Sequence, residues 1–217
     1  MSEIPQRIII VDDHPLFRKG LIQLLRTVPG FDLVAEAADG KEGIRQILHL
    51  RPDLLLLDLN MKEMSGLEVL RFVKQADLDT RVVMVTVSDA ADDLVAALRA
   101  GADGYLLKDM EPEEMVEALR TAAAGRIVVS DALTHLLAAA LRDEKRPESA
   151  SAAGLTEREQ GILDCIAGGL SNKQIARELN IAEGTVKVHV KHLLRKLNFR
   201  SRVEAAVWAV EHTRSER

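Results

Sequence analysis

The stretch LLLLDLNM, from Leu54 to Met61, joins four consecutive leucines to an aspartate, Asp58, and then to a more polar segment. Four aliphatic residues in a row are typical of a strand that is buried on both faces of a parallel sheet. An aspartate directly after such a strand lies at the carboxyl edge of the sheet, where open α/β sheets bind their ligands. This stretch therefore predicts a central strand with a chemically active end.

On both sides of this strand, short aliphatic runs alternate with segments of helical periodicity. The predicted strands are residues 8–11, 33–36, 54–57, 82–87 and 105–107. The predicted helices are residues 15–27, 40–50, 66–75, 90–100 and 113–124. Five strand–helix units in succession predict an α/β doubly wound, five-stranded parallel sheet with helices on both faces.

The composition is that of a globular protein: 47% of the residues are hydrophobic, 29% are charged and only 3% are aromatic. No apolar run approaches the roughly 20 residues that span a bilayer, and residues 1–7 lack the layout of a signal peptide. We therefore expect a cytoplasmic protein. The single cysteine, Cys165, cannot form an internal disulfide and is interpreted as a small buried core residue.

The formal net charge of −5 by itself argues against a nucleic-acid partner, because phosphate backbones attract basic proteins. However, residues 150–217 hold 11 Lys and Arg against 8 Asp and Glu, a net charge of +3. Residues 1–149 hold the remaining 18 Lys and Arg against 26 Asp and Glu, a net charge of −8. The chain thus separates an acidic part from a basic part.

Polar side chains follow or end four of the predicted strands. Asp12 and Asp13 follow the first strand, Asp58 follows the third, Thr86 lies near the end of the fourth and Lys108 follows the fifth. Carboxylates held close together repel, and a hard cation such as Mg²⁺ relieves that repulsion. The metal and the lysine would offset the charge of a phosphoryl group, which leaves Asp58, alone on the central strand, as the candidate nucleophile.

Four motifs at these positions resemble the response-regulator receiver family in their order and spacing. They are VDDHP at 11–15, LLLLDLNM at 54–61, VTVSD at 85–89 and YLLKD at 105–109. The resemblance covers about the first 125 residues. It implies a flavodoxin-like fold with strand order 2-1-3-4-5.

The same resemblance implies a role for each residue of the pocket. Asp58 would accept phosphate from a histidine kinase. Asp13, Asp58 and the main-chain carbonyl of Asn60 would ligate Mg²⁺, with Asp12 assisting through water. Thr86 and Tyr105 would form the switch pair, and Lys108 would contact the phosphoryl group. Asn60 and Ser88 occupy positions that tune dephosphorylation, and His14 is interpreted as a loop residue rather than a ligand.

Beyond the receiver, the chain contains a helical piece at 131–141 and a tether at 142–154 that is rich in Ser, Ala and charge. The predicted domains are 1–127, the linker and tether 128–154, and an all-helical domain 155–217. Its predicted helices are residues 156–167, 171–179, 183–197 and 201–211. Three of these begin with capping-box spacing: Thr156 with Glu159, Ser171 with Gln174 and Ser201 with Glu204.

The third of these helices has an apolar stripe and a basic face. The stripe consists of Val186, Val190, Leu193, Leu194 and Leu197. Between 183 and 202 six Lys and Arg stand against one Glu, a net charge of +5. Lys187 and Lys191 are four residues apart, hence on one side of the helix, and Val188 offers an apolar contact to a thymine methyl. A short helix, a turn and this longer helix predict a DNA-binding helix-turn-helix.

The segments LTEREQGIL, GLSNKQIARELNIAEGTVKVHVKHLLRKL and SRVEAAVWAV resemble the LuxR-type helix-turn-helix. Joined to a receiver, that domain defines the NarL/FixJ family of two-component response regulators, and the basic segment is most similar to the NarL subfamily. The resemblance implies base contacts by Lys187, Val188 and Lys191, with Arg195 on the same DNA-binding helix. It also implies dimer contacts by Val207 and Trp208, a homodimer on promoter DNA after phosphorylation, and a response to nitrate or nitrite.

Ala182 departs from this pattern, because the family has a polar cap at the start of the recognition helix. A missing cap costs about 0.5 to 2 kcal/mol.

We also expect the unphosphorylated receiver to pack on the recognition helix and phosphorylation to release it.

Three other functions compete with this interpretation. A phosphatase or phosphotransferase would also use an aspartate nucleophile with Mg²⁺, but Asn60 stands where such hydrolases have a second acid. A ligand-sensing LuxR-type regulator would need an aromatic-rich pocket, which the amino-terminal half lacks. A receiver that acts without phosphorylation, through protein contacts alone, stays open. We predict a regulator, not an enzyme.

Overall fold

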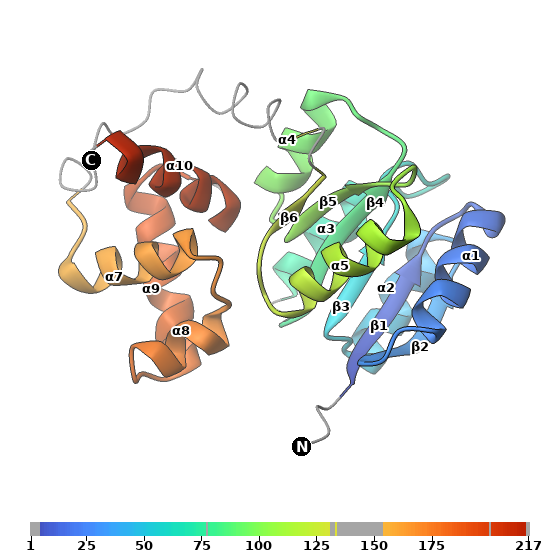
Figure 1. Cartoon of the computed structure of the whole chain (residues 1–217), viewed down its shortest axis with the longest axis horizontal. Coiled ribbons are helices and arrows are strands. Elements are labelled where there is room, and N and C mark those ends of the chain that lie inside the picture. The colour runs from blue at the N-terminus through green and yellow to red at the C-terminus, as the bar shows by residue number, and fades with distance from the viewer. Residues whose placement is uncertain (1–4, 77, 131–132, 134–153, 200, 216–217) are drawn as a thin grey trace.

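The structure, a computed structural model, describes residues 5–76, 78–130, 133, 154–199 and 201–215. These residues form an α/β domain and a helical domain (Figure 1). The strands are β1 (Gln6–Val11), β2 (Phe31–Ala37), β3 (Leu54–Leu57), β4 (Arg81–Thr86), β5 (Gly104–Leu107) and β6 (Val128–Val129). The helices of the α/β domain are α1 (Pro15–Arg26), α2 (Gly40–Leu50), α3 (Gly66–Gln75), α4 (Ala91–Arg99) and α5 (Pro112–Ala123). Those of the helical domain are α7 (Glu157–Ala167), α8 (Asn172–Glu178), α9 (Glu183–Lys196) and α10 (Arg202–Ser215).

The strands form one parallel sheet in the order β2-β1-β3-β4-β5-β6. The predicted order of the first five strands is confirmed. The sixth strand was not predicted, because residues from 128 onwards were assigned to the linker. Val128 and Val129 instead pair with Gly104 and Tyr105 at the sheet edge. Two residues are too few to show a period, so the sequence carries no strand signal there.

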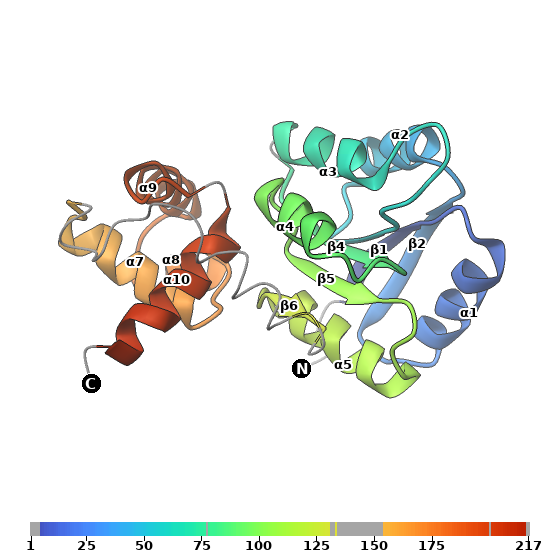
Figure 2. The ribbon, with the colours of Figure 1, turned by 90° about the horizontal axis from the view of Figure 1, so that it is seen from above.

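The sheet separates two apolar cores, and helices cover both faces (Figure 2). Alternate residues of β1 face opposite sides, so that Ile9 and Val11 join one core while Ile8 and Ile10 join the other. The first core is completed by α2, α3 and α4, and the second by α1 and α5. Because both faces are covered, the ends of the strands are the part of the sheet left for chemistry.

The loop after β3 is packed tightly against the start of α3. The Gly66 backbone N–H donates to the Leu59 carbonyl at 2.9 Å. A Cβ added to Gly66 would lie 2.0 Å from the Asp58 carbonyl oxygen, a backbone atom that cannot rotate away. The capping box of Ser65 and Glu68 fixes the first turn of α3 directly beside it. This contact holds the backbone that carries Asp58.

The helical domain has its own core, and its predicted capping boxes are confirmed at α7 and α8. Buried residues come from all four helices and include Ile162, Ile175, Leu193 and Trp208. Cys165 packs against this core, as predicted, but is only partly buried. The predicted helix at 131–141 lies outside the described residues, apart from position 133.

Contacts between the two domains involve α4 and α10, together with the start of α9. Val203 of α10 is buried and belongs to the same apolar cluster as the receiver residues of α4. Arg99, the last residue of α4, lies 4.0 Å from the Glu204 carboxylate. The Lys187 ammonium of α9 forms an ion pair with Asp79, in the loop before β4. In this arrangement one end of α9 lies against the receiver.

We predict that Gly66→Ala lowers the free energy of unfolding by about 1–3 kcal/mol, the usual cost of overpacking. The new methyl group would collide with the Asp58 carbonyl. The control is Gly20→Ala in α1, where nothing lies within 4 Å of the added Cβ, and it should stabilise the helix by about 0.5–1 kcal/mol. Urea denaturation measures both. Equal effects of the two substitutions would contradict the tight contact.

Candidate functional site

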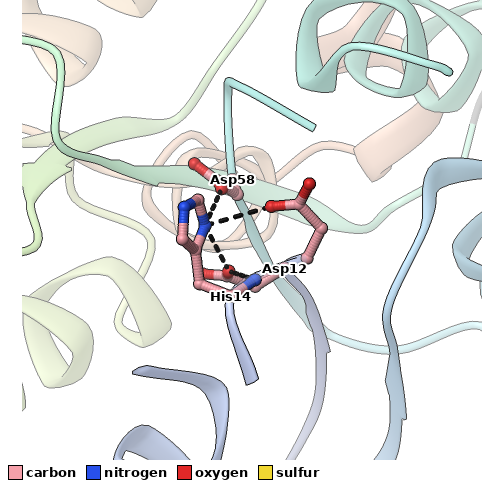
Figure 3. Close-up of side chains that lie close together, drawn as sticks. Asp12, His14 and Asp58 are labelled. Carbon is pink, nitrogen blue, oxygen red and sulfur yellow. Dashed lines mark hydrogen bonds and ion pairs between the residues drawn. The ribbon is translucent and has the colours of Figure 1, made fainter. Parts of the chain in front are cut away.

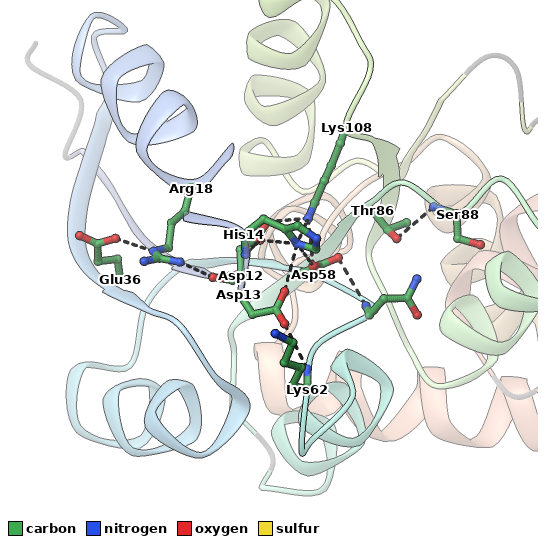
Figure 4. A network of polar contacts seen from close by, with 11 residues as sticks. Asp12, Asp13, His14, Arg18, Glu36, Asp58, Lys62, Thr86, Ser88 and Lys108 are labelled. Atoms are coloured by element: carbon green, nitrogen blue, oxygen red, sulfur yellow. Dashed lines mark hydrogen bonds and ion pairs between the residues drawn. The ribbon is translucent and has the colours of Figure 1, made fainter. Parts of the chain in front are cut away.

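The predicted pocket residues meet at the carboxyl edge of the sheet, around the ammonium of Lys108 (Figure 4). The Lys108 Nζ lies 2.8 Å from the Asp12 Oδ2 and 2.9 Å from the Asp58 Oδ2. Both carboxylates are buried, and the lysine side chain is only 7% exposed. A buried cation between two buried carboxylates offsets their repulsion. Removal of the lysine or of a carboxylate would leave an unpaired charge buried away from water.

The lysine side chain is also positioned by α1, which the sequence analysis did not anticipate. The Lys108 Nζ lies 4.9 Å from the centroid of the Phe17 ring, a cation–π distance. Arg18 donates from Nη1 to the Asp12 carbonyl at 2.6 Å and pairs through Nε with Glu36 at 2.7 Å. Phe17 and Arg18 reach the pocket because α1 begins shortly after Asp12 and Asp13. Their roles could not be predicted, because an aromatic residue and an arginine on an amphipathic helix carry no distinctive sequence signal.

The Asp13 carboxylate is a candidate metal ligand of this pocket. One of its oxygens, Oδ2, accepts a hydrogen bond from the Lys62 backbone N–H at 3.2 Å. The other, Oδ1, is buried and accepts no hydrogen bond within the described residues. Because an unsatisfied buried oxygen is costly, a divalent cation beside Asp13, Asp12 and Asp58 fits this pocket.

His14 is a loop residue, as predicted, and its ring also enters the pocket (Figure 3). Its Nδ1 lies 3.0 Å from Asp13 Oδ1, 3.2 Å from Asp58 Oδ2 and 3.3 Å from Asp12 Oδ1. It is also 3.3 Å from the Lys108 Nζ. The sequence signal was the VDDHP motif itself, which places this histidine next to the acid pair.

The predicted switch residues Thr86 and Tyr105 are both fully buried beside this pocket. Thr86 Oγ1 accepts a hydrogen bond from the Ser88 backbone N–H at 3.2 Å. The Tyr105 hydroxyl donates to the Ser88 carbonyl at 3.0 Å. The two side chains therefore hold the same residue, Ser88, from opposite ends of its backbone. Asn60 is exposed, and its backbone N–H lies 3.4 Å from Asp58 Oδ1.

The predicted DNA-binding helix corresponds to α9. Val186, Leu193 and Leu197 of its apolar stripe are buried and Val190 and Leu194 are partly buried, as the periodicity predicted. On the other side, Lys191 and Arg195 are exposed and Val188 is 53% exposed. Lys187 is the member of the basic face that lies against the receiver. Ala182 forms no side-chain cap, as predicted.

The residues predicted for dimer contacts lie in two different environments. Trp208 is buried in the core of the helical domain, where its ring centroid lies 5.9 Å from that of Phe199. Val207 is partly buried and packs against the receiver cluster. A dimer contact by Val207 therefore requires the two domains to move apart.

This arrangement defines a receiver joined to a DNA-binding domain, and comparison with known families agrees. Residues 8–120 match the family described as "Response regulator receiver domain", and residues 153–209 match "Bacterial regulatory proteins, luxR family". The chain belongs to the two-component response regulators with a LuxR-type DNA-binding domain. It is a transcription regulator and not an enzyme. No helix in the described part of the chain is long and apolar enough to cross a membrane.

Among individual proteins, the chain is similar to the nitrate/nitrite response regulator NarL of Escherichia coli K12. The two are 52% identical over 207 residues, 95% of this chain and 96% of NarL. The nitrate/nitrite response regulator NarP of the same organism is 49% identical over 94% of each chain. A solved receiver domain of the response regulator NarL from Mycobacterium tuberculosis is 37% identical, with a TM-score of 0.56 over 57% of this chain and all of that one.

Burial raises the pKa of the Tyr105 hydroxyl from 10 to about 12, although its hydrogen bond to Ser88 opposes the shift. Because the folded pKa lies above the unfolded one, the stabilisation is complete below pH 10 and is lost as the pH rises towards 12. Tyr105 is the only tyrosine, so absorbance near 295 nm reports it alone. We predict that tyrosinate appears in the same pH range in which circular dichroism records alkaline unfolding. Titration near pH 10 in a folded protein would contradict this.

Proposed function

We propose that this protein is a phosphorylation-activated transcription regulator in which Asp58 accepts phosphate from a sensor histidine kinase. The supporting observation is the contact of Lys108 with both Asp12 and Asp58 in a buried pocket at the sheet edge. An Asp58 carboxylate oxygen attacks the phosphorus atom of phosphohistidine, and the phosphorus–nitrogen bond breaks. The histidine nitrogen leaves with the electron pair.

The pocket supports binding of Mg²⁺ by Asp13, Asp58 and the main-chain carbonyl of Asn60, with Asp12 acting through water. When bound, the ion neutralises charge on the phosphoryl oxygens. Lys108 supplies the second positive charge, from within hydrogen-bond distance of Asp58. Phosphorylation adds about 1.5 to 2 negative charges, so both cations are needed to keep the phosphorylated pocket stable.

Thr86 and Tyr105 are proposed to report the phosphoryl group to the surface. Both bind the backbone of Ser88, and Ser88 Oγ donates to Asp93 in the first turn of α4 at 2.6 Å. A hydrogen bond from the Thr86 hydroxyl to a phosphoryl oxygen would pull on this segment. The phosphoryl group then shifts an existing equilibrium between two arrangements of α4.

The DNA partner is proposed to be double-stranded promoter DNA read by α9 in the major groove. Lys187, Val188 and Lys191 are proposed to contact bases, with Arg195 one turn further along the same helix. Before phosphorylation, the Lys187–Asp79 pair and the burial of Val203 hold this helix against the receiver. Release would free Lys187 for DNA, and Val207, with the helix of Trp208, for a homodimer on paired half-sites.

The signal is proposed to be nitrate or nitrite, acting through the kinase. The support is the 52% and 49% identity to regulators named for those anions, over nearly the whole chain. Such a regulator would act in the cytoplasm, where promoter DNA lies.

We predict that Asp58→Asn abolishes phosphate-dependent DNA protection while leaving the fold intact. The amide keeps the size of the side chain but cannot attack phosphorus. The measurement is footprinting on a promoter library at fixed salt, with Mg²⁺ and a small acyl phosphate present. Asp32→Asn, on the exposed face of β2, is the matched control and should behave like the wild type.

Equal protection by the wild type and the Asp58→Asn variant would leave Asp58 without a regulatory role and favour a receiver that acts through protein contacts alone. Rapid turnover of small phosphate esters by the wild type would favour the enzyme instead. Phosphate-dependent protection that only Asp58→Asn removes would support the proposed function.

We further predict that residues 154–217 alone bind the same DNA more tightly than the unphosphorylated full chain, by about 10-fold at matched salt. That domain has its own apolar core and should fold independently. Removal of the receiver exposes Lys187, and each freed phosphate contact strengthens binding. Fluorescence anisotropy with labelled DNA measures both affinities. Weaker binding by the isolated domain would show that the receiver does not inhibit.

A further inference from the structure

We propose that His14 is a nitrogen ligand of the acidic pocket that strengthens the binding of a first-row divalent transition ion, such as Co²⁺, relative to Mg²⁺. This inference rests on the proposed function, because it concerns the same pocket. It adds a ligand that the aspartates do not provide. The supporting observation is the position of His14 Nδ1 among three carboxylates from two strand ends.

The distances fit a shared cation. Ligand atoms at right angles around an octahedral ion with bonds of 2.0–2.1 Å are about 3.0 Å apart. His14 Nδ1 lies 3.0 Å from Asp13 Oδ1 and 3.2 Å from Asp58 Oδ2. Asp13 Oδ1 is also the buried oxygen that accepts no hydrogen bond in the described part of the chain. One ion between these atoms would satisfy all of them.

Hydrogen bonds from His14 cannot satisfy the same set of atoms. A ring nitrogen carries at most one proton, so Nδ1 cannot donate fully to oxygens of Asp12, Asp13 and Asp58 together. The Lys108 ammonium, which has only donors, faces the same nitrogen at 3.3 Å and requires its lone pair. Nδ1 is then unprotonated, and an unprotonated ring nitrogen beside three carboxylates offers the electron pair that a metal ion binds in place of the ammonium.

The nitrogen determines which ions gain from this ligand. Mg²⁺ prefers oxygen and keeps several of its waters, so His14 adds little to its binding. Imidazole favours the later first-row ions, whose affinities rise from Mn²⁺ to Co²⁺ and beyond. His14 is therefore a specificity-determining residue of the pocket, and the chemical class it selects is a divalent transition ion.

His14 can be replaced without harm to the fold. Its side chain is 55% exposed, and although it is the N-cap residue of α1, it forms no side-chain cap. The backbone N–H of His14 donates to Asp12 Oδ1 at 2.7 Å, and substitution of the side chain leaves that bond in place. His49→Ala, at an exposed histidine of α2, is the matched control.

The first measurement is calorimetric titration of the full chain with Mg²⁺ and, separately, Co²⁺. We expect His14→Ala to weaken Co²⁺ binding by about 10-fold or more, the scale on which partners of a metal site change affinity. Mg²⁺ binding should change by less than about twofold, since oxygen ligands dominate it. His49→Ala should change neither. Equal effects of His14→Ala on both ions, or none, would overturn the inference.

The second measurement detects the nitrogen directly. Pulsed electron paramagnetic resonance of bound Mn²⁺ should show coupling to a ¹⁴N nucleus in the wild type, and the coupling should disappear in His14→Ala. Asp13→Asn tests the pocket itself. Mg²⁺ binding unchanged by Asp13→Asn would refute the proposed magnesium site, whereas ¹⁴N coupling absent from the wild type would refute only the role of His14.

Discussion

The ammonium of Lys108 between Asp12 and Asp58 is the interaction on which the receiver depends. Two carboxylates at strand ends repel each other, and because both are buried, solvent screens that repulsion only weakly. Lys108 offsets the repulsion only while β1, β3 and β5 keep their register, because each residue directly follows its strand. The packing of the sheet therefore determines whether the charges of the pocket are balanced. Gly66 also contributes, because it has no side chain and the start of α3 can therefore pack against the Asp58 carbonyl.

The main features of the pocket could be predicted because the end of a strand is a local property of the sequence. Four leucines before Asp58 define both the strand and the edge at which it ends. The residues that position the pocket could not be predicted in this way. His14 lies directly before α1 and Phe17 lies in its first turn, and only the fold shows that they face Lys108. The strand β6 was missed because two residues show no period.

In the helical domain, periodicity predicted what is buried within α9 but not what the helix contacts. Val186 and Leu193 follow from their spacing, whereas the ion pair of Lys187 with Asp79 joins residues 108 positions apart. At the predicted capping box of α10, the Ser201 hydroxyl accepts a hydrogen bond from the Glu204 backbone N–H, and the Glu204 carboxylate lies 4.0 Å from Arg99 of the receiver. Contacts between domains leave no local signal because they involve residues that no window of sequence brings together.

The position of α4 explains how a small change in the pocket can reach the DNA-binding domain. Its first turn is bonded to Ser88 through Asp93, and Ser88 is held by Thr86 and Tyr105. Its last residue, Arg99, lies beside α10. A helix of nine residues is about 13 Å long and moves as a rigid body, so displacement at one end is not absorbed along its length. The contact with α10 combines the buried Val203 with the Arg99–Glu204 pair, and partly polar contacts between domains separate more readily than a packed core. A shift of α4 would therefore act directly on its contact with α10, which belongs to the same interface between the domains as the Lys187–Asp79 pair of α9.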